Sequence, residues 1–271
     1  MRTWYERVPK VELHVHLEGS IPLDTLWRLV TKYGGDPSTP DIDALQRRFA
    51  YRDFTHFIDT WMWQMSFLRE YDDFTLIAEG VARDFAKQNI RYVEAFYSPP
   101  DFRRHGIEPM PLTEAVRAGL DRVPEVDVRL VADLVRGYGP EQGSITLAQL
   151  RGAQSLGVIG IGLGGREAGF PATPFADIYA KARDMGFRTS AHAGEAAGPE
   201  SVWGAVRDAR VERIGHGTRA VEDERLLDYL AERRISVETC PISNVKTAVI
   251  PSVAEHPIRE FIRRGIPVSV N

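Results

Sequence analysis

The sequence predicts an α/β fold, a (β/α)8 barrel of the TIM type, and three observations lead to this prediction. The chain has 271 residues, and about 250 residues are typical of this barrel. Short β-branched or apolar segments recur eight times along the chain, which predicts eight strands. Longer amphipathic segments lie between most of them, and this alternation is typical of parallel strands joined by covering helices.

The strands and helices follow in regular order. The predicted strands cover residues 11–17, 91–97, 128–134, 158–163, 188–193, 213–218, 235–240 and 267–270. Two intervening segments, 112–123 and 225–234, repeat apolar residues at the i, i+3, i+4 spacing of a helix that covers a sheet. A doubly wound open sheet is the competing architecture. It is disfavoured because no Gly-x-Gly-x-x-Gly pattern follows the first predicted strand.

Two features depart from an idealised barrel. The connection between the first two predicted strands is about seventy residues long, far beyond an ordinary βα connection. We expect a helical insertion over about residues 20–88, in which the aromatic segment 54–67 forms a lid-like helix beside the barrel mouth. The sequence ends at Asn271, directly after the eighth predicted strand, and we expect the C-terminal helix of the barrel to be missing from it. We otherwise expect one domain over residues 1–271.

The composition indicates a soluble globular protein. Hydrophobic residues make up 43% and charged residues 27% of the chain, which excludes a disordered chain. The net charge of -4 gives no broad basic field, so no nucleic acid is expected as a partner. The apolar segment 152–165 is too short to cross a membrane. One cysteine, Cys240, excludes a Cys-rich zinc site and, with no export signal in residues 1–7, favours the cytoplasm.

Four histidines fall at or near the carboxyl ends of predicted strands, where this fold places its active site: His14, His16, His192 and His216. His14 and His16 are two residues apart in one strand, so both imidazoles should point into the barrel. This pair alone is a weak sign of a metal site, because two hydrogen-bonded histidines in a polar barrel mouth are the alternative. His192 on another strand strengthens the metal interpretation, since three protein ligands and an open position are typical of catalytic zinc.

Two further residues indicate acid–base chemistry. Glu195 follows His192 by three residues, and the glycine between them permits a tight turn that would hold the carboxyl group over the barrel mouth. The alternative for Glu195 is a solvated residue in a first helical turn. His216 lies between two glycines at a strand end, which favours approach to substrate or water over a place in the core.

Motifs spread along the chain carry a resemblance to a known family. They are Pro9-Lys-Val-Glu-Leu-His-Val-His-Leu-Glu-Gly-Ser20, Gly162-Leu-Gly-Gly-Arg-Glu167, Ala191-His-Ala-Gly-Glu195, Ile214-Gly-His-Gly217 and Glu238-Thr-Cys-Pro-Ile-Ser-Asn244. In residue type and order they resemble the adenosine deaminase family of the metal-dependent amidohydrolase superfamily. The resemblance covers nearly the whole chain. Zinc deaminases with a Pro-Cys-x-x-Cys signature are a different lineage, which a chain with one cysteine cannot join.

The resemblance implies a zinc-dependent enzyme that replaces the 6-amino group of an aminopurine by oxygen and releases ammonia. The ligands of one zinc ion would be His14, His16 and His192. Glu195 resembles the acid that protonates purine N1, and His216 resembles the residue that orients and deprotonates the attacking water. Gly165 resembles the glycine whose backbone N–H donates to purine N3, and His16 and Glu18 would border the substrate.

The substrate itself is the most open expectation. Adenosine-selective members commonly have Asp where this chain has Glu18, whereas Glu also occurs in the adenine and aminodeoxyfutalosine branches. We rank adenosine-type nucleosides first, an aminodeoxyfutalosine-type nucleoside second and free adenine third. Residues 53–58 could supply an apolar wall for a larger substituent, and a substrate carboxylate could pair with one of three arginines: Arg103, Arg104 or Arg166.

Two alternative functions remain open, and the end of the sequence differs from the family pattern. An amidohydrolase that acts on a lactone or amide is one alternative, and a non-catalytic purine-binding pseudoenzyme is the other. In the family, the last strand continues into an Asp-Asp pair that gives a fourth zinc ligand and a contact to purine N7. The present sequence stops one residue before that pair, and we expect the natural chain to continue through it.

Overall fold

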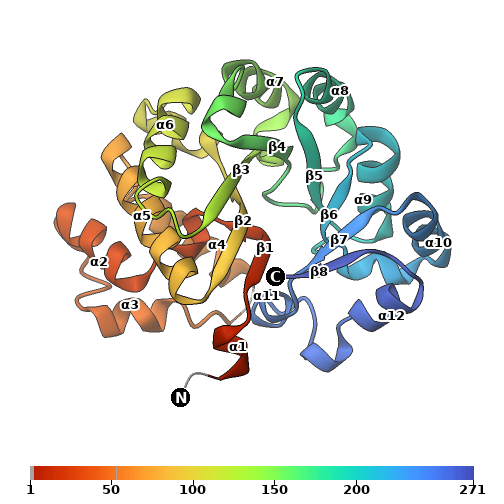
Figure 1. Ribbon diagram of the computed structural model, residues 1–271, viewed down its shortest axis with the longest axis horizontal. Coiled ribbons are helices and arrows are strands. Elements are labelled where there is room, and N and C mark those ends of the chain that lie inside the picture. Colours follow the sequence, from red (N-terminus) through yellow and green to blue (C-terminus); the bar gives the residue numbers. More distant parts are fainter. Residues whose placement is uncertain (1–2, 53) are drawn as a thin grey trace.

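The barrel forms from eight strands. The structure is a computed structural model that describes residues 3–52 and 54–271. The predictions for residues 1–7 and 53–58 therefore lie partly outside the described residues, at Met1, Arg2 and Asp53. The strands are hydrogen-bonded in the order β1 to β8, with every neighbouring pair parallel. They form a nearly closed barrel with helices outside it (Figure 1), which confirms the predicted fold class.

Each predicted strand is present, with bounds that differ from the prediction by two residues or fewer. The strands are β1 (Lys10–His16), β2 (Ile90–Tyr97), β3 (Asp127–Asp133), β4 (Val158–Gly162), β5 (Arg188–Ala193), β6 (Arg213–His216), β7 (Ser236–Thr239) and β8 (Val268–Val270). β6 ends two residues early because His216 has a φ of 62°, a left-handed conformation that cannot continue a strand.

Helices follow most of the strands. They are α1 (Trp4–Arg7), α2 (Leu23–Lys32), α3 (Ile42–Arg48), α4 (Phe54–Met65), α5 (Tyr71–Lys87), α6 (Pro109–Leu120), α7 (Gly139–Gln149), α8 (Ala176–Asp184), α9 (Pro199–Trp203), α10 (Glu224–Arg233), α11 (Pro241–Lys246) and α12 (Ile258–Arg263). The predicted helices 112–123 and 225–234 are α6 and α10. α6 begins three residues before its predicted start because Pro109 occupies the first helical position, where its missing N–H costs nothing.

The long connection between β1 and β2 is helical, as predicted. α2 to α5 fill it, and α5 packs against α6 and β2. α4 lies within the aromatic segment that we expected to form a lid-like helix. Across residues 3–52 and 54–271, no helix has both the length and the apolar character that a membrane crossing needs.

The apolar core lies between the strands and the helices outside them. Along β3, Leu130 and Ala132 are fully buried members of this core. The alternate residues Val131 and Asp133 line pockets inside the barrel. This alternation follows from the two-residue period of a strand, and it places polar side chains in the barrel interior while the outer face remains apolar.

Candidate active site

A pocket opens at the carboxyl ends of the strands, the end at which we expected the active site. Predicted site residues line it, namely His16, Gly165, His192, Glu195 and His216. Phe57, Ile58 and Trp61 of α4 form an apolar side of the same pocket. The helix of the insertion therefore lies at the barrel mouth, beside the residues that carry the polar chemistry.

Three histidine nitrogens converge at the base of this pocket. Nε2 of His14 lies 3.1 Å from Nε2 of His192, and Nε2 of His16 lies 3.0 Å from the same atom. Burial lowers the pKa of each of these imidazoles below its ordinary value, so the neutral form that binds metal is favoured. Three neutral nitrogens from two strands fit a metal ion that keeps an open position.

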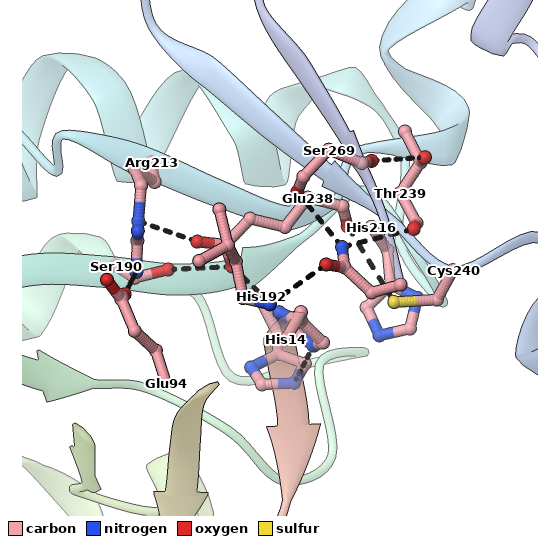
Figure 2. Close-up of polar contacts among 12 residues, drawn as sticks. His14, Glu94, Ser190, His192, Arg213, His216, Glu238, Thr239, Cys240 and Ser269 are labelled. Atoms are coloured by element: carbon pink, nitrogen blue, oxygen red, sulfur yellow. Dashed lines mark hydrogen bonds and ion pairs between the residues drawn. The ribbon is translucent and has the colours of Figure 1, made fainter. Parts of the chain in front are cut away.

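His14 is held from behind by a buried polar network (Figure 2). Its Nδ1 lies 2.7 Å from Oε2 of Glu238 on β7, so the Nδ1–H group donates to the carboxylate and Nε2 faces the other histidines. The carboxylate of Glu238 is in turn 2.6 Å from Nε of Arg213, whose guanidinium also contacts Glu94. A carboxylate behind a histidine in this way is the usual support of a metal ligand.

A second group of potential ligands, His14, His216 and Cys240, is a weaker metal site. A thiol binds metal well only as the thiolate. Burial raises the pKa of the Cys240 thiol far above its ordinary value, and this keeps the thiol protonated. The three-histidine group is therefore the better candidate.

Glu195 and His216 face each other across the pocket. Nδ1 of His216 lies 3.5 Å from Oε1 of Glu195 and 3.0 Å from the side-chain nitrogen of Asn244, whose amide group donates to it. Burial raises the pKa of Glu195 above its ordinary value. The alternative of a solvated helix-start residue is wrong for Glu195, because its side chain is 15% exposed and α9 begins only at Pro199.

Hydrogen bonds with two buried side chains, Glu167 and Arg136, fix the backbone at and next to the turn that carries Glu195. The carboxylate of Glu167 accepts four backbone N–H groups, those of residues 194, 195, 196 and 197, at 2.6, 3.1, 2.6 and 3.0 Å. The buried guanidinium of Arg136 donates to the carbonyl oxygens of Phe170 and His192. One carboxylate and one guanidinium thus fix the backbone that forms this wall of the pocket.

Comparison with known proteins agrees with this geometry. A sequence model of the family described as "Adenosine deaminase" matches residues 9–271. The chain belongs to the adenosine deaminase family. It is a hydrolytic deaminase and a metal-dependent amidohydrolase, which confirms the family and enzyme class predicted from the motifs.

Relatives within the family differ in their named substrates. The aminodeoxyfutalosine deaminase of Streptomyces coelicolor is 37% identical over 269 residues, which cover 97% of this chain and 70% of that protein. The adenosine deaminase of Yersinia pseudotuberculosis is 35% identical over 275 residues, which cover 98% of this chain and 81% of that protein. The family therefore fixes the reaction type and leaves the purine derivative to be identified.

Solved structures share the barrel. The adenine deaminase of Arthrobacter aurescens superimposes with a TM-score of 0.88 at 28% identity, covering 97% of this chain and 81% of that one. An amidohydrolase from Burkholderia ambifaria, crystallised with bound Zn, has a TM-score of 0.88 at 30% identity, covering 98% and 75%. The Zn bound in that amidohydrolase is consistent with the three converging histidines of this chain.

The two remaining predicted residues lie in different surroundings. Gly165 lines the pocket with a φ of 87°, a conformation that favours glycine. Glu18 lies deeper, fully buried, where its Oε1 accepts the backbone N–H of Ser98 at 2.9 Å. Ser98 itself lines the pocket, so Glu18 supports the pocket wall from behind. Burial raises the pKa of Glu18 to about 7.

Sequence reasoning gave no role to several residues that the structure brings to the site: Asp133, Arg136, Glu167, Glu238 and Asn244. Glu167, Glu238 and Asn244 stand inside the motifs quoted above. Asp133 and Glu238 are charged residues near the carboxyl ends of predicted strands. That placement is the signal that marks them, because a buried charged side chain there must find a partner. The partner itself is not visible in the sequence.

Proposed function

We propose that the protein hydrolyses the 6-amino group of an aminopurine nucleoside, with one zinc ion held by His14, His16 and His192. The observation that supports this proposal most directly is the convergence of the three Nε2 atoms at the base of the pocket that Glu195 and His216 also line. Bound there, zinc would lower the pKa of a coordinated water to about 7 and so supply a nucleophile at neutral pH.

The other groups of the site transfer protons and orient the purine. Glu195, whose pKa burial raises, gives a proton to ring nitrogen N1 and makes C6 more electrophilic. His216 takes one proton of the attacking water and passes it to the leaving amino group, which departs as ammonia. The second proton of that water returns to Glu195 when the C6–O bond becomes a carbonyl. The N–H of Gly165 donates to N3 and fixes the purine plane. The aromatic side of α4 excludes bulk water from the pocket.

Replacement of the ligands tests the metal part of the proposal. His14→Ala and His192→Ala should each lose most of the zinc and all activity, because too few ligands remain on a rigid barrel wall. Zinc content after dialysis measures this directly. His105→Ala is the matched control, since His105 lies in the 3-10 helix Pro99–His105 and outside the three-histidine group. Full zinc content in both ligand variants would refute the assignment.

An adenosine-type nucleoside is the first candidate substrate. The pocket has the apolar side and the polar base that a purine with an exocyclic amino group needs. Ultraviolet-monitored deamination of adenosine, of free adenine and of a carboxylated adenine nucleoside separates the candidates. Absence of ammonia release from all three by zinc-loaded protein would refute these aminopurines as substrates.

One observation favours a second candidate, a nucleoside of the aminodeoxyfutalosine type. Asp101 lines the active-site pocket and also a neighbouring pocket, which Arg103, Arg104 and Tyr138 line as well. An anionic group on an extended substituent would meet guanidinium groups there. A kcat/KM for the carboxylated nucleoside about 10³-fold above that for adenosine, about 4 kcal/mol, would place this substrate first, and Arg103→Ala or Arg104→Ala should then erase the preference.

A cytoplasmic location is also part of the proposal. Cys240, the single cysteine of the chain, is a buried free thiol. A reducing compartment suits such a thiol.

A further inference from the structure

Asp133, the last residue of β3, carries a buried carboxyl group that the chemistry above does not use. The residue is 1% exposed. Its Oδ2 lies 3.8 Å from Nδ1 of His16, and its Oδ1 has no hydrogen-bond partner within the described residues. Nδ1 of His16 is likewise buried and, among those same residues, without a hydrogen-bond partner. The carboxyl group and the imidazole thus face each other, and among these residues each has a buried polar atom without a hydrogen-bond partner, Oδ1 of Asp133 and Nδ1 of His16.

The arrangement repeats that of His14 on the same strand. His14 turns Nε2 toward the metal centre and donates from Nδ1 to Glu238. His16 also turns Nε2 toward the centre, and its Nδ1 faces Asp133. Because burial of an unpaired carboxyl group is costly, a carboxyl group is retained at such a place when it serves a partner. The partner that the geometry offers is the imidazole of His16.

The neighbouring strand makes room for this carboxyl group. Gly162 and Gly164 lie at the end of β4 and just beyond it, and a side chain at either position would collide with Asp133. A Cβ atom added at Gly164 would lie 2.6 Å from Oδ2 of Asp133, and its three nearest atoms all belong to that carboxyl group. The glycine at this position therefore shapes the space that the oxygen facing His16 occupies.

We propose that Asp133 is a positioning residue for the metal site, which accepts a hydrogen bond from Nδ1–H of His16 and so aims Nε2 at the zinc ion. This inference rests on the proposed three-histidine site. Metal binding fixes the ring of His16, and closure of the distance between Nδ1 and Oδ2 then gives the buried Nδ1 of His16 its hydrogen-bond partner. Carboxylates behind ligating histidines typically change metal affinity about 10- to 100-fold.

Zinc retention by the holoenzyme against a graded series of chelator concentrations tests the role of Asp133. Asp133→Ala should weaken zinc binding about 10- to 100-fold. Asp133→Asn should weaken it less, because the amide oxygen still accepts a hydrogen bond but carries no charge. Asp101→Asn is the matched control, since Asp101 is the other aspartate that lines the pocket, and it should retain zinc like the wild type. Thermal midpoints in saturating zinc verify that each variant is folded.

Gly164→Ala provides a second, independent test. In the wild-type background the added methyl group should displace the carboxyl group of Asp133 and weaken zinc binding. In the Asp133→Ala background the same methyl group meets no carboxyl group and should have little further effect. The two substitutions should therefore be strongly non-additive in zinc affinity, which a structural defect at each site would not produce.

Specific results would overturn the inference. Zinc affinity of Asp133→Ala within twofold of the wild type, or an equal effect of Gly164→Ala in both backgrounds, would do so. A raised KM with unchanged zinc retention in Asp133→Asn would instead assign Asp133 to the substrate. If the wild-type protein retains no zinc, the proposed function fails together with the inference, whereas retention in the wild type and in every variant removes only the role of Asp133.

Discussion

The chemistry of single residues in this protein depends on the side chains that contact them and on how deeply they are buried. His14 and His16 share a strand and a direction, but Glu238 contacts one imidazole at 2.7 Å and Asp133 lies 3.8 Å from the other. Glu195 is a carboxyl group of ordinary type whose pKa is raised by burial. On an open surface the carboxyl groups would be charged and the imidazoles would be free to rotate. Glu195 could then not act as an acid, and the histidines could not hold a metal ion in place.

Glu195→Gln tests proton donation at this scale. The variant should keep its zinc and lose about 10²- to 10⁴-fold in kcat, the usual size of a lost general acid. A general acid works while it holds its proton, so wild-type kcat should fall as pH rises through the raised pKa of Glu195. That alkaline decline should be absent from the variant. Near wild-type turnover at neutral pH would remove Glu195 from the mechanism.

Secondary-structure elements supply the positions, and the turn after β5 is the clearest case. Glu167 fixes this turn through four backbone N–H groups, and Glu195 is carried on it. The turn is therefore held by a residue that follows β4, so two consecutive βα connections form one rigid unit.

Glu167→Gln should loosen that unit. Loss of charge-assisted hydrogen bonds should lower the free energy of unfolding by about 2 kcal/mol, and a displaced Glu195 should lower kcat by up to about 10²-fold. Zinc content should stay at the wild-type level. Glu200→Gln is the matched control, because its carboxylate accepts the N–H of Gly198 in the same loop. Equal losses in both variants would contradict a specific role for Glu167.

The start of α5 depends on a buried charge, and this gives a pH prediction. Burial by itself would raise the pKa of Asp73, but hydrogen bonds from Lys32 and Tyr33 and from the backbone N–H groups of Arg69 and Glu70 hold the pKa below its ordinary value. A lowered pKa stabilises the fold above the unfolded-state value, about 3.9, and this stabilisation is lost as pH falls through the folded-state pKa.

Asp73→Asn should therefore destabilise the protein by about 2–3 kcal/mol at pH 7, and the difference from the wild type should shrink below about pH 4. Urea unfolding at a series of pH values measures this. Asp72→Asn is the control, since Asp72 stands beside Asp73 in the first turn of the same helix and is exposed. A pH-independent difference for Asp73→Asn would argue against a charge effect.

At the scale of the whole molecule, the proposed metal site connects distant parts of the barrel. His14 and His16 lie on β1, and His192 lies on β5, 176 positions after His16. A metal held by both strands ties the two halves of the sheet together. Metal binding is therefore coupled to the stability of the entire barrel.

Removal of zinc should lower the thermal midpoint. A ligand present at about 1,000 times its Kd stabilises the fold by about 4.1 kcal/mol, and each kcal/mol corresponds to about 2–4 °C for chains near this size. The midpoint should thus fall by about 8 °C or more on chelation and recover when zinc is returned. The His192→Ala variant should show almost no change on chelation. An unchanged wild-type midpoint would show that the metal does not bridge the strands.

The sequence by itself determined the order of the strands and the helical connections between them, and it predicted the residues that carry the chemistry. These features are local. A two-residue period sends His14 and His16 to one side of a strand, and apolar segments of strand or helix length specify each element. β6 shows the limit of such reasoning, because the left-handed backbone of His216 depends on the turn into which the strand leads.

Only the tertiary structure decided which groups support one another. Glu238 is 224 positions from the His14 ring that it holds, and Glu167 is 27 positions or more from the N–H groups that it accepts. Asp133 reaches His16 because β1, β2 and β3 are adjacent in a curved sheet and β4 leaves a glycine beside it. The physical reason is that these contacts depend on strand register and barrel closure, which are properties of the packed sheet and leave no periodic signal along the chain.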